Sequence, residues 1–137
     1  MGNDINVIVV DDDDLNLEII EEYVDGEGYS TKTFTNGISA WEYLNSSPNE
    51  VDVILLDKMM PHMNGLQLVE KMKSDIRLRD IPIIMISADD REKDIYESQK
   101  KGLFRYIVKP FEREVLLTSL ESATNHVKGQ DVAQSDF

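Results

Sequence analysis

The sequence predicts a single α/β domain in which helices cover both faces of a five-stranded parallel sheet. The first observation is that short apolar runs alternate five times with longer amphipathic segments, a pattern typical of parallel sheets. The second is that 41% of the 137 residues are hydrophobic, which is enough for the core of one domain. The third is that no repeat and no linker-like segment divides the chain.

Runs of apolar and β-branched residues predict the five strands. The first, INVIVV, is typical of a buried strand, whereas the second, YSTKTF, alternates and predicts a less buried strand at an edge of the sheet. The predicted strands are Ile5–Val10, Tyr29–Phe34, 51–56, 82–86 and 104–108.

Segments with apolar residues at helical spacing predict the five helices. Asn36 is a good cap for the start of the second helix, while Gly28 and Gly102 are expected to end the first and the fourth. The predicted helices are 14–27, 36–46, 64–74, 91–101 and 111–127. We expect the domain to span residues 1–127 and residues 128–137 to form a polar C-terminal tail.

Composition excludes several classes of function. The chain has 27 acidic and 14 basic residues and a formal net charge of −13, which argues against direct binding to nucleic acid. It has no cysteine, so disulfides, thiol nucleophiles and thiolate metal sites are excluded. No run approaches the ~18 apolar residues of a membrane span, and the N-terminus lacks a secretion signal. We therefore expect a cytoplasmic protein without a membrane anchor.

Polar groups follow four of the five predicted strands. Asp11–Asp14 come after the first strand, Asp57 after the third, Ser87 after the fourth and Lys109 after the fifth. Ligands of parallel sheets bind outside the carboxyl ends of the strands, and neighbouring strands lie about 4.8 Å apart. If the third strand lies between the first and the fourth, Asp57 has carboxylates on one side and a hydroxyl on the other.

This group of side chains is suited to phosphoryl transfer. Several carboxylates in one pocket repel one another, and a hard divalent cation relieves that repulsion; ligand sets of oxygen alone favour Mg²⁺ over Zn²⁺. Asp57 is placed as a nucleophile toward phosphorus, which would give an aspartyl phosphate. Lys109 and Ser87 can neutralise and hold the transferred group. Asp13 and Asp14 fit the start of a helix better than a metal site.

Four motifs together resemble the receiver domains of two-component response regulators, those of chemotaxis included. The resemblance extends from about residue 6 to residue 127, and the motifs fall in the order and spacing of that family. They are VVDDD at 9–13, LLDKMMPHMNG at 55–65, IMISA at 84–88 and KPF at 109–111. One departure is Lys58, which directly follows Asp57 and adds a positive charge near the pocket.

The resemblance implies a role for each site residue. Asp57 matches the phosphoacceptor and also a Mg²⁺ ligand. Asp11 and Asp12 match the acidic pair, with Asp12 a direct ligand and Asp11 acting partly through water. The backbone carbonyl of Met59 matches the third protein ligand.

The resemblance also implies a switch and a flavodoxin-like fold with the strand order 2-1-3-4-5. Ser87 and Lys109 match the residues that hold the phosphoryl group. Tyr106 matches the aromatic residue that turns from outside to inside when Ser87 moves. The peptide bond between Lys109 and Pro110 matches one that is usually cis.

The implied partners follow from the same family. A histidine kinase or a histidine phosphotransfer protein is the expected donor, in a phosphorelay or a simple two-component system. The domain would catalyse its own phosphorylation and dephosphorylation rather than act as a conventional enzyme. An output domain, a partner or a second copy of the chain would meet one face. That face consists of the helix from Arg91 to Lys101, the strand from Phe104 to Val108 and the helix from Phe111 to Val127.

Two other functions fit part of the pattern. A haloacid-dehalogenase-type phosphatase also places a D-x-D motif after its first strand, as Asp11 and Asp13 would, but its late carboxylates follow the lysine, whereas Asp57 precedes Lys109. A degenerate receiver that serves only for docking would lack a pocket residue, and none is missing. The site of phosphorylation, Asp57 or Asp11, distinguishes the first alternative.

Overall fold

The computed structural model describes the backbone of residues 4–135 and the side chains of residues 4–125. Five strands form one parallel sheet in the order β2-β1-β3-β4-β5. The strands are β1 Ile5–Val10, β2 Tyr29–Phe34, β3 Val53–Asp57, β4 Ile83–Ser87 and β5 Arg105–Val108. This order confirms the flavodoxin-like fold and the position of β2 at an edge.

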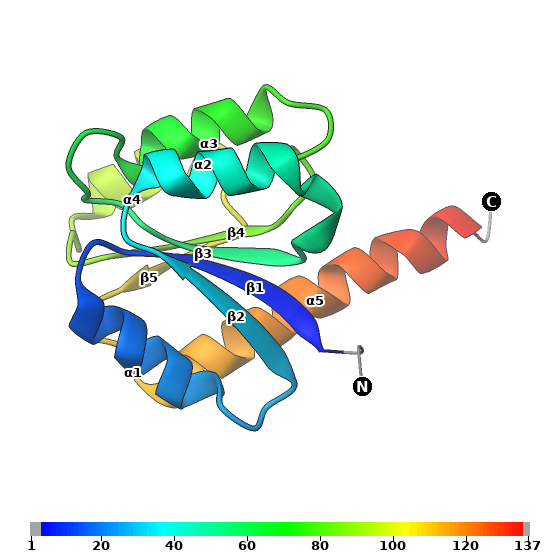
Figure 1. Ribbon diagram of the computed structural model, residues 1–137, viewed down its shortest axis with the longest axis horizontal. Coiled ribbons are helices and arrows are strands. Elements are labelled where there is room, and N and C mark those ends of the chain that lie inside the picture. The colour runs from blue at the N-terminus through cyan, green and yellow to red at the C-terminus, as the bar shows by residue number, and fades with distance from the viewer. Residues whose placement is uncertain (1–3, 136–137) are drawn as a thin grey trace.

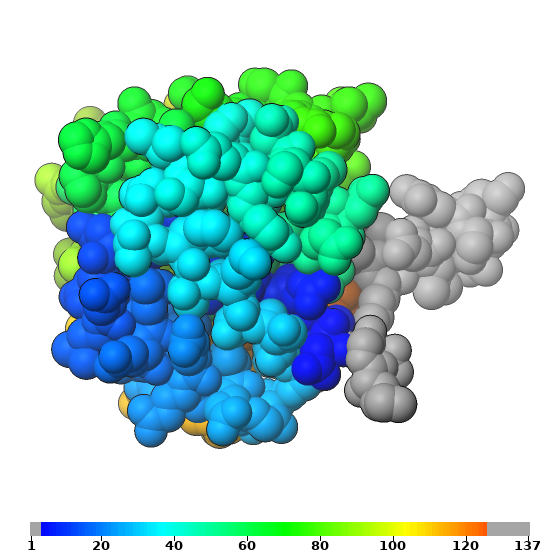
Figure 2. Space-filling model, viewed as in Figure 1, coloured from blue at the N-terminus to red at the C-terminus, as the bar shows by residue number. Residues whose placement is uncertain are grey.

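Five helices alternate with the strands and cover both faces of the sheet (Figure 1). They are α1 Asp14–Val24, α2 Gly37–Ser46, α3 Gly65–Lys73, α4 Glu92–Gln99 and α5 Arg113–Ser135, with a short 3₁₀ turn at Pro48–Glu50. Figure 2 shows α2 and α3, in cyan to green, on one side of the edge strand β2, and α1, in blue, on the other.

Alternation along the strands divides the core into two layers. In β1, Ile8 and Val10 face the layer of α2 and α3, whereas Val7 and Val9 face the layer of α1 and α5. Successive strand residues point to opposite faces, and both faces of β3 and β4 are buried along their whole length. The central strands therefore hold the ends that carry Asp57 and Ser87 in fixed positions.

Most predicted boundaries hold within a few residues, but the predicted C-terminal ends of α1 and α5 were wrong. α1 ends at Val24 rather than at residue 27, because Gly26 rather than Gly28 is the first residue to adopt a positive φ, at 76°. α5 begins at Arg113 and continues past the predicted end at residue 127 to Ser135. The single Gly129 weakens a helix without necessarily ending it. The last turns of α5 extend beyond the sheet (Figure 1).

β3 begins at Val53 rather than at residue 51. The turn Pro48–Glu50 precedes it, and the Asp52 carboxylate accepts a hydrogen bond of 2.7 Å from the backbone N–H of Asn6. A proline at the start of this turn presets φ for a bend. β3 and β4 each extend one residue further than predicted, so that Asp57 and Ser87 are their last residues.

Candidate functional site

The carboxyl edge of the sheet brings the predicted site residues together. Asp57 and Ser87 are the last residues of β3 and β4, and Asp57 pairs in register with Ile86. Asp11 follows β1 directly and is buried. Lys109 follows β5, and its backbone N–H donates a 2.8 Å hydrogen bond to the Ser87 carbonyl. The peptide bond between Lys109 and Pro110 is cis, as predicted.

Three carboxylates and one ammonium group form the centre of this edge. One carboxylate oxygen each from Asp11, Asp12 and Asp57 lie within 4.8 Å of one another. The Lys109 Nζ lies 3.1 Å from Asp11 Oδ2 and 3.4 Å from Asp57 Oδ1. The Lys109 ammonium therefore bridges the two buried carboxylates. Asp12 is the exposed member of the group.

Burial and crowding make the ionised form of Asp57 costly. Desolvation, reinforced by the neighbouring Asp11 carboxylate, raises the pKa of Asp57 to about 6. Lys109 and the Met59 backbone N–H, 3.4 Å from Asp57 Oδ1, act in the opposite direction without cancelling the effect. Burial lowers the pKa of Lys109, but the Asp57 and Asp11 carboxylates outweigh burial, so that this pKa is raised.

The two remaining aspartates of the DDDD run belong to helix α1. Asp13 is the N-cap, and its carboxylate accepts a 2.9 Å hydrogen bond from the Leu15 backbone N–H. Its own N–H donates to Asp11 Oδ1 at 2.9 Å. Asp14 is the first helical residue, where a negative charge interacts favourably with the helix dipole. Asp13 is therefore a helix cap, as predicted, and Asp14 lies in the first turn of the helix without a capping hydrogen bond.

The loop after Asp57 folds back tightly onto the end of β3. A Cβ added at Gly65 would lie 2.5 Å from the Asp57 carbonyl oxygen and 2.9 Å from the Lys58 Cα, so only glycine fits at this first position of α3. His62 has a φ of 67°, a conformation uncommon outside glycine. Met59 is 66% exposed, so this loop lies at the protein surface.

The two predicted switch residues meet at a residue that the sequence analysis did not select, Asp89. The Ser87 hydroxyl is fully buried and accepts a 3.0 Å hydrogen bond from the Asp89 backbone N–H. The Tyr106 hydroxyl donates a 2.8 Å hydrogen bond to the Asp89 carbonyl. Lys58, which directly follows Asp57, reaches Asp89 Oδ2 with its ammonium at 3.1 Å. No sequence pattern pairs Lys58 with Asp89, because only the conformation of the β4–α4 loop brings the two side chains together.

The donor set suits a hard divalent cation. All three side chains are carboxylates, and two of them are buried beside a single compensating lysine. Burial first, and then the Asp11 carboxylate, raise the pKa of Asp57, so a bound cation would favour its ionised form. Oxygen ligands of this kind match Mg²⁺ better than Zn²⁺.

Comparison with known proteins identifies the family. The family model of the response regulator receiver domain matches residues 7–121 of this sequence. The chain belongs to the response regulator receiver domain family. The receiver domain is 39% identical over 116 residues to chemotaxis protein CheY1 of Helicobacter pylori, a match that covers 84% of this chain and 93% of that protein. It is 33% identical over 129 residues to the CheY homolog of Campylobacter jejuni, covering 93% and 98%.

A solved structure supports the same assignment. The receiver domain resembles a chain in the CheX–CheY–BeF₃–Mg²⁺ complex of Borrelia burgdorferi with a TM-score of 0.80 and 27% identity, covering 86% of this chain and 87% of that one. The family match decides against the dehalogenase-type phosphatase as the fold family of this chain. Within residues 4–135, none of the helices is long and apolar enough to cross a membrane.

The raised pKa of Asp57 predicts how stability depends on pH. In the unfolded chain this carboxyl has its ordinary pKa of about 3.9, so ionisation costs more in the folded state. The contribution of Asp57 to the free energy of unfolding is therefore fully present below about pH 4, where the group is protonated in both states. It is lost as pH rises through the folded-state pKa of about 6. In metal-free protein, Asp57→Asn should therefore raise the free energy of unfolding at pH 8 by about 1–2 kcal/mol, after allowance for solvent screening.

Urea denaturation with a chelator, repeated from pH 3.5 to 8, measures this difference. Glu21→Gln, which removes an exposed carboxylate from α1, is the matched control and should show no comparable pH-dependent gain. An Asn variant less stable than the parent at pH 8 would contradict the crowded, desolvated environment of Asp57.

Proposed function

We propose that this receiver domain accepts a phosphoryl group on Asp57, with Mg²⁺ bound beside it, and passes the signal on through a change of conformation. The observation that carries the proposal is the position of the Asp57 carboxylate, buried at the end of β3 and flanked by Asp11 and Lys109. It is the one member of the acidic group at the end of a central strand, with β1 on one side and β4 on the other.

The expected donor is a phosphorylated histidine of a kinase or phosphotransfer protein. An Asp57 carboxylate oxygen attacks phosphorus, the P–O bond forms, the P–N bond to the imidazole breaks, and the imidazole nitrogen keeps the electron pair and takes up a proton. Lys109 moves little in this step, because its ammonium already lies 3.4 Å from Asp57 Oδ1, and it balances charge on the phosphoryl oxygens. Hydrolysis by water later returns the free carboxylate.

Asp11, Asp12, Asp57 and the backbone carbonyl of Met59 would hold Mg²⁺. The carboxylate oxygens lie within 4.8 Å of one another, and Asp12 is exposed to solvent. When bound, Mg²⁺ supplies charge neutralisation and orientation for phosphoryl transfer. The residues themselves exclude bulk water from one side of Asp57, which is only 6% exposed.

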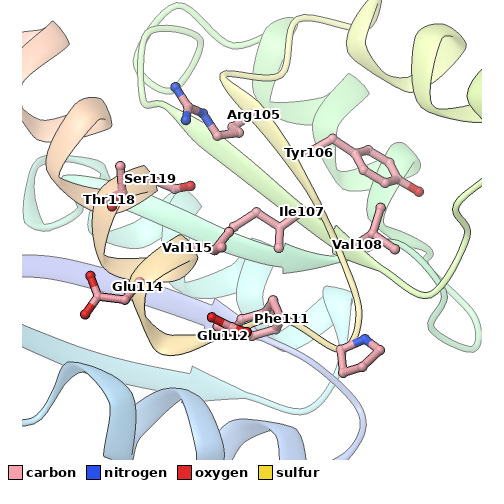
Figure 3. Close-up of a pocket in the computed structure, with 11 residues that line it drawn as sticks. Arg105, Tyr106, Ile107, Val108, Phe111, Glu112, Glu114, Val115, Thr118 and Ser119 are labelled. Carbon is pink, nitrogen blue, oxygen red and sulfur yellow. The ribbon is translucent and has the colours of Figure 1, made fainter.

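The phosphorylated state would be read at the face of α4, β5 and α5, by an output domain, a partner or a second copy of the chain. α4 has a single buried residue, Ser98, so few contacts oppose its movement. A groove of about 740 Å³ lies between β5 and α5. Figure 3 shows Ile107 on the side toward α5 and the Tyr106 ring on the other side of β5. A turn of Tyr106 after Ser87 moves would alter this face.

Acetyl phosphate with Mg²⁺ tests the proposal with a chemically simple donor. The intact protein should gain the mass of one phosphoryl group, and Asp57→Asn should gain none. Asp13→Asn is the matched control, because it changes a neighbouring carboxylate whose role is to cap α1, and it should still be phosphorylated. Equal phosphorylation of the Asp57→Asn protein would overturn the assignment.

Metal binding is testable without phosphorylation. Mg²⁺ should raise the melting temperature, because a ligand at 100 times its Kd stabilises the native state by about 2.7 kcal/mol. Asp12→Ala should lose most of this gain, while Asp14→Ala, which removes a neighbouring exposed carboxylate, should keep it. A melting temperature that Mg²⁺ and chelator leave unchanged would show that the acidic group is not a metal site.

A further inference from the structure

Asp89, in the loop between β4 and α4, is held by contacts from four side chains. Its carboxylate accepts hydrogen bonds from the Lys58 Nζ at 3.1 Å and from the Arg91 Nε at 3.0 Å. Its backbone N–H donates to the Ser87 Oγ at 3.0 Å, and its carbonyl accepts from the Tyr106 hydroxyl at 2.8 Å. One loop residue therefore contacts both residues of the proposed switch.

The ion pair with Lys58 is the sheltered part of this network. The side chains of Lys58 and Asp89 are 11% and 12% exposed, whereas that of Arg91 is 76% exposed. Exposed ion pairs contribute little, but loss of one partner from a sheltered pair is costly. The Lys58 Nζ also lies 5.6 Å from the centre of the Tyr106 ring. Arg91 also donates to the Asp89 carboxylate from its backbone N–H and from Nη2, each at 3.2 Å, but these bonds hold Asp89 within its own loop. The pair with Lys58 is the contact that joins the Asp89 side chain to the end of β3.

Lys58 anchors the loop to the strand that carries the phosphoacceptor. It directly follows Asp57, and its backbone N–H donates a 3.1 Å hydrogen bond to the Ile86 carbonyl of β4. Its own backbone is therefore fixed to the sheet. Through Lys58, the β4–α4 loop is tied to the end of β3.

This tie opposes the movement that the proposed function requires of Ser87. A hydroxyl that turns toward a phosphoryl group on Asp57 leaves the Asp89 N–H, which must then follow or lose its partner. Loss of a hydrogen bond by a sheltered backbone group is unfavourable. The N–H can follow only if the Asp89 side chain leaves or carries with it the Lys58 ammonium.

We propose that the Lys58–Asp89 ion pair is a latch: it positions the β4–α4 loop and the Ser87 hydroxyl in the arrangement described here and so disfavours the phosphorylated conformation. Lys58 and Asp89 are positioning residues that act through Ser87. The latch rests on the proposed function, since it assumes that a phosphoryl group on Asp57 draws Ser87 toward it. It adds a determinant of how readily this particular chain switches.

The sign of the change in affinity for a phosphoryl mimic distinguishes a latch from a simple electrostatic effect of Lys58 and Asp89. The probe is beryllofluoride with Mg²⁺, a phosphoryl mimic. Lys58→Met removes a positive charge close to Asp57 and by electrostatics alone should weaken binding of an anion, whereas Asp89→Asn should strengthen it. If the pair is a latch, both substitutions raise the competent population and strengthen binding, by about fivefold or more, the lower end of ordinary coupling between sites.

The double variant and a conservative variant complete the cycle. Lys58→Met with Asp89→Asn should bind no more tightly than the tighter single variant, because the latch is lost only once. The double variant also leaves no unpaired charge at this position, so its affinity for the mimic can be measured even if the Asp89→Asn protein folds poorly. Lys58→Arg keeps the charge and should restore the affinity of the parent. Lys71→Met, which removes a lysine that lies over the Trp41 ring on another face, should leave the affinity unchanged.

A second readout follows the loop itself. In NMR spectra of the protein without the mimic, Lys58→Met should move the Asp89 amide resonance toward its position in the mimic-bound parent. Opposite signs for the two single variants, or an unmoved Asp89 amide, would overturn the latch. If the parent failed to bind the mimic, the proposed function would fall, and the Asp89 amide of the Lys58→Met protein would still decide whether Lys58 positions the loop.

Discussion

The repulsion between the Asp11 and Asp57 carboxylates, only partly balanced by Lys109, is the interaction on which the rest of the site depends. Two charges 4 Å apart repel by about 4 kcal/mol at an effective dielectric of 20, and both carboxylates are buried. The sheet bears this cost because β1 and β3 are neighbours, so the two groups cannot separate without disrupting the core. The site is thereby prepared for a cation, which would offset this repulsion.

The core and the site impose opposite demands on the same strands. β3 reads VILLD, with four apolar residues that pack into both layers and a fifth that ends at the carboxyl edge. The apolar residues fix the strand, and the tight contact at Gly65 fixes the loop that follows it. Rigidity is thus greatest beneath Asp57. The looser elements, α4 and the β4–α4 loop, lie beside it, where a change of charge can be converted into movement.

Much of this arrangement could be predicted from sequence because it depends on local pattern. Alternating strand and helix signals gave the fold class, and the rule that ligands bind at the carboxyl ends of parallel strands brought Asp57, Ser87 and Lys109 together. The network at Asp89 could not be predicted in this way, because it depends on how a loop places one carboxylate against Lys58, 31 positions earlier in the chain. The end of α1 was missed for a similar reason, since Gly26 and Gly28 are both competent to stop a helix and only the fold selects between them.

Asp57, and no other carboxylate of the acidic group, is expected to be the nucleophile that attacks phosphorus. Borohydride reduction of the phosphorylated protein converts an aspartyl phosphate to homoserine, and peptide mapping then locates that residue in the sequence. We expect homoserine at position 57 alone. Homoserine at position 11 or 12, with Asp57 intact, would contradict the claim and favour the chemistry of a phosphatase with its nucleophile after the first strand.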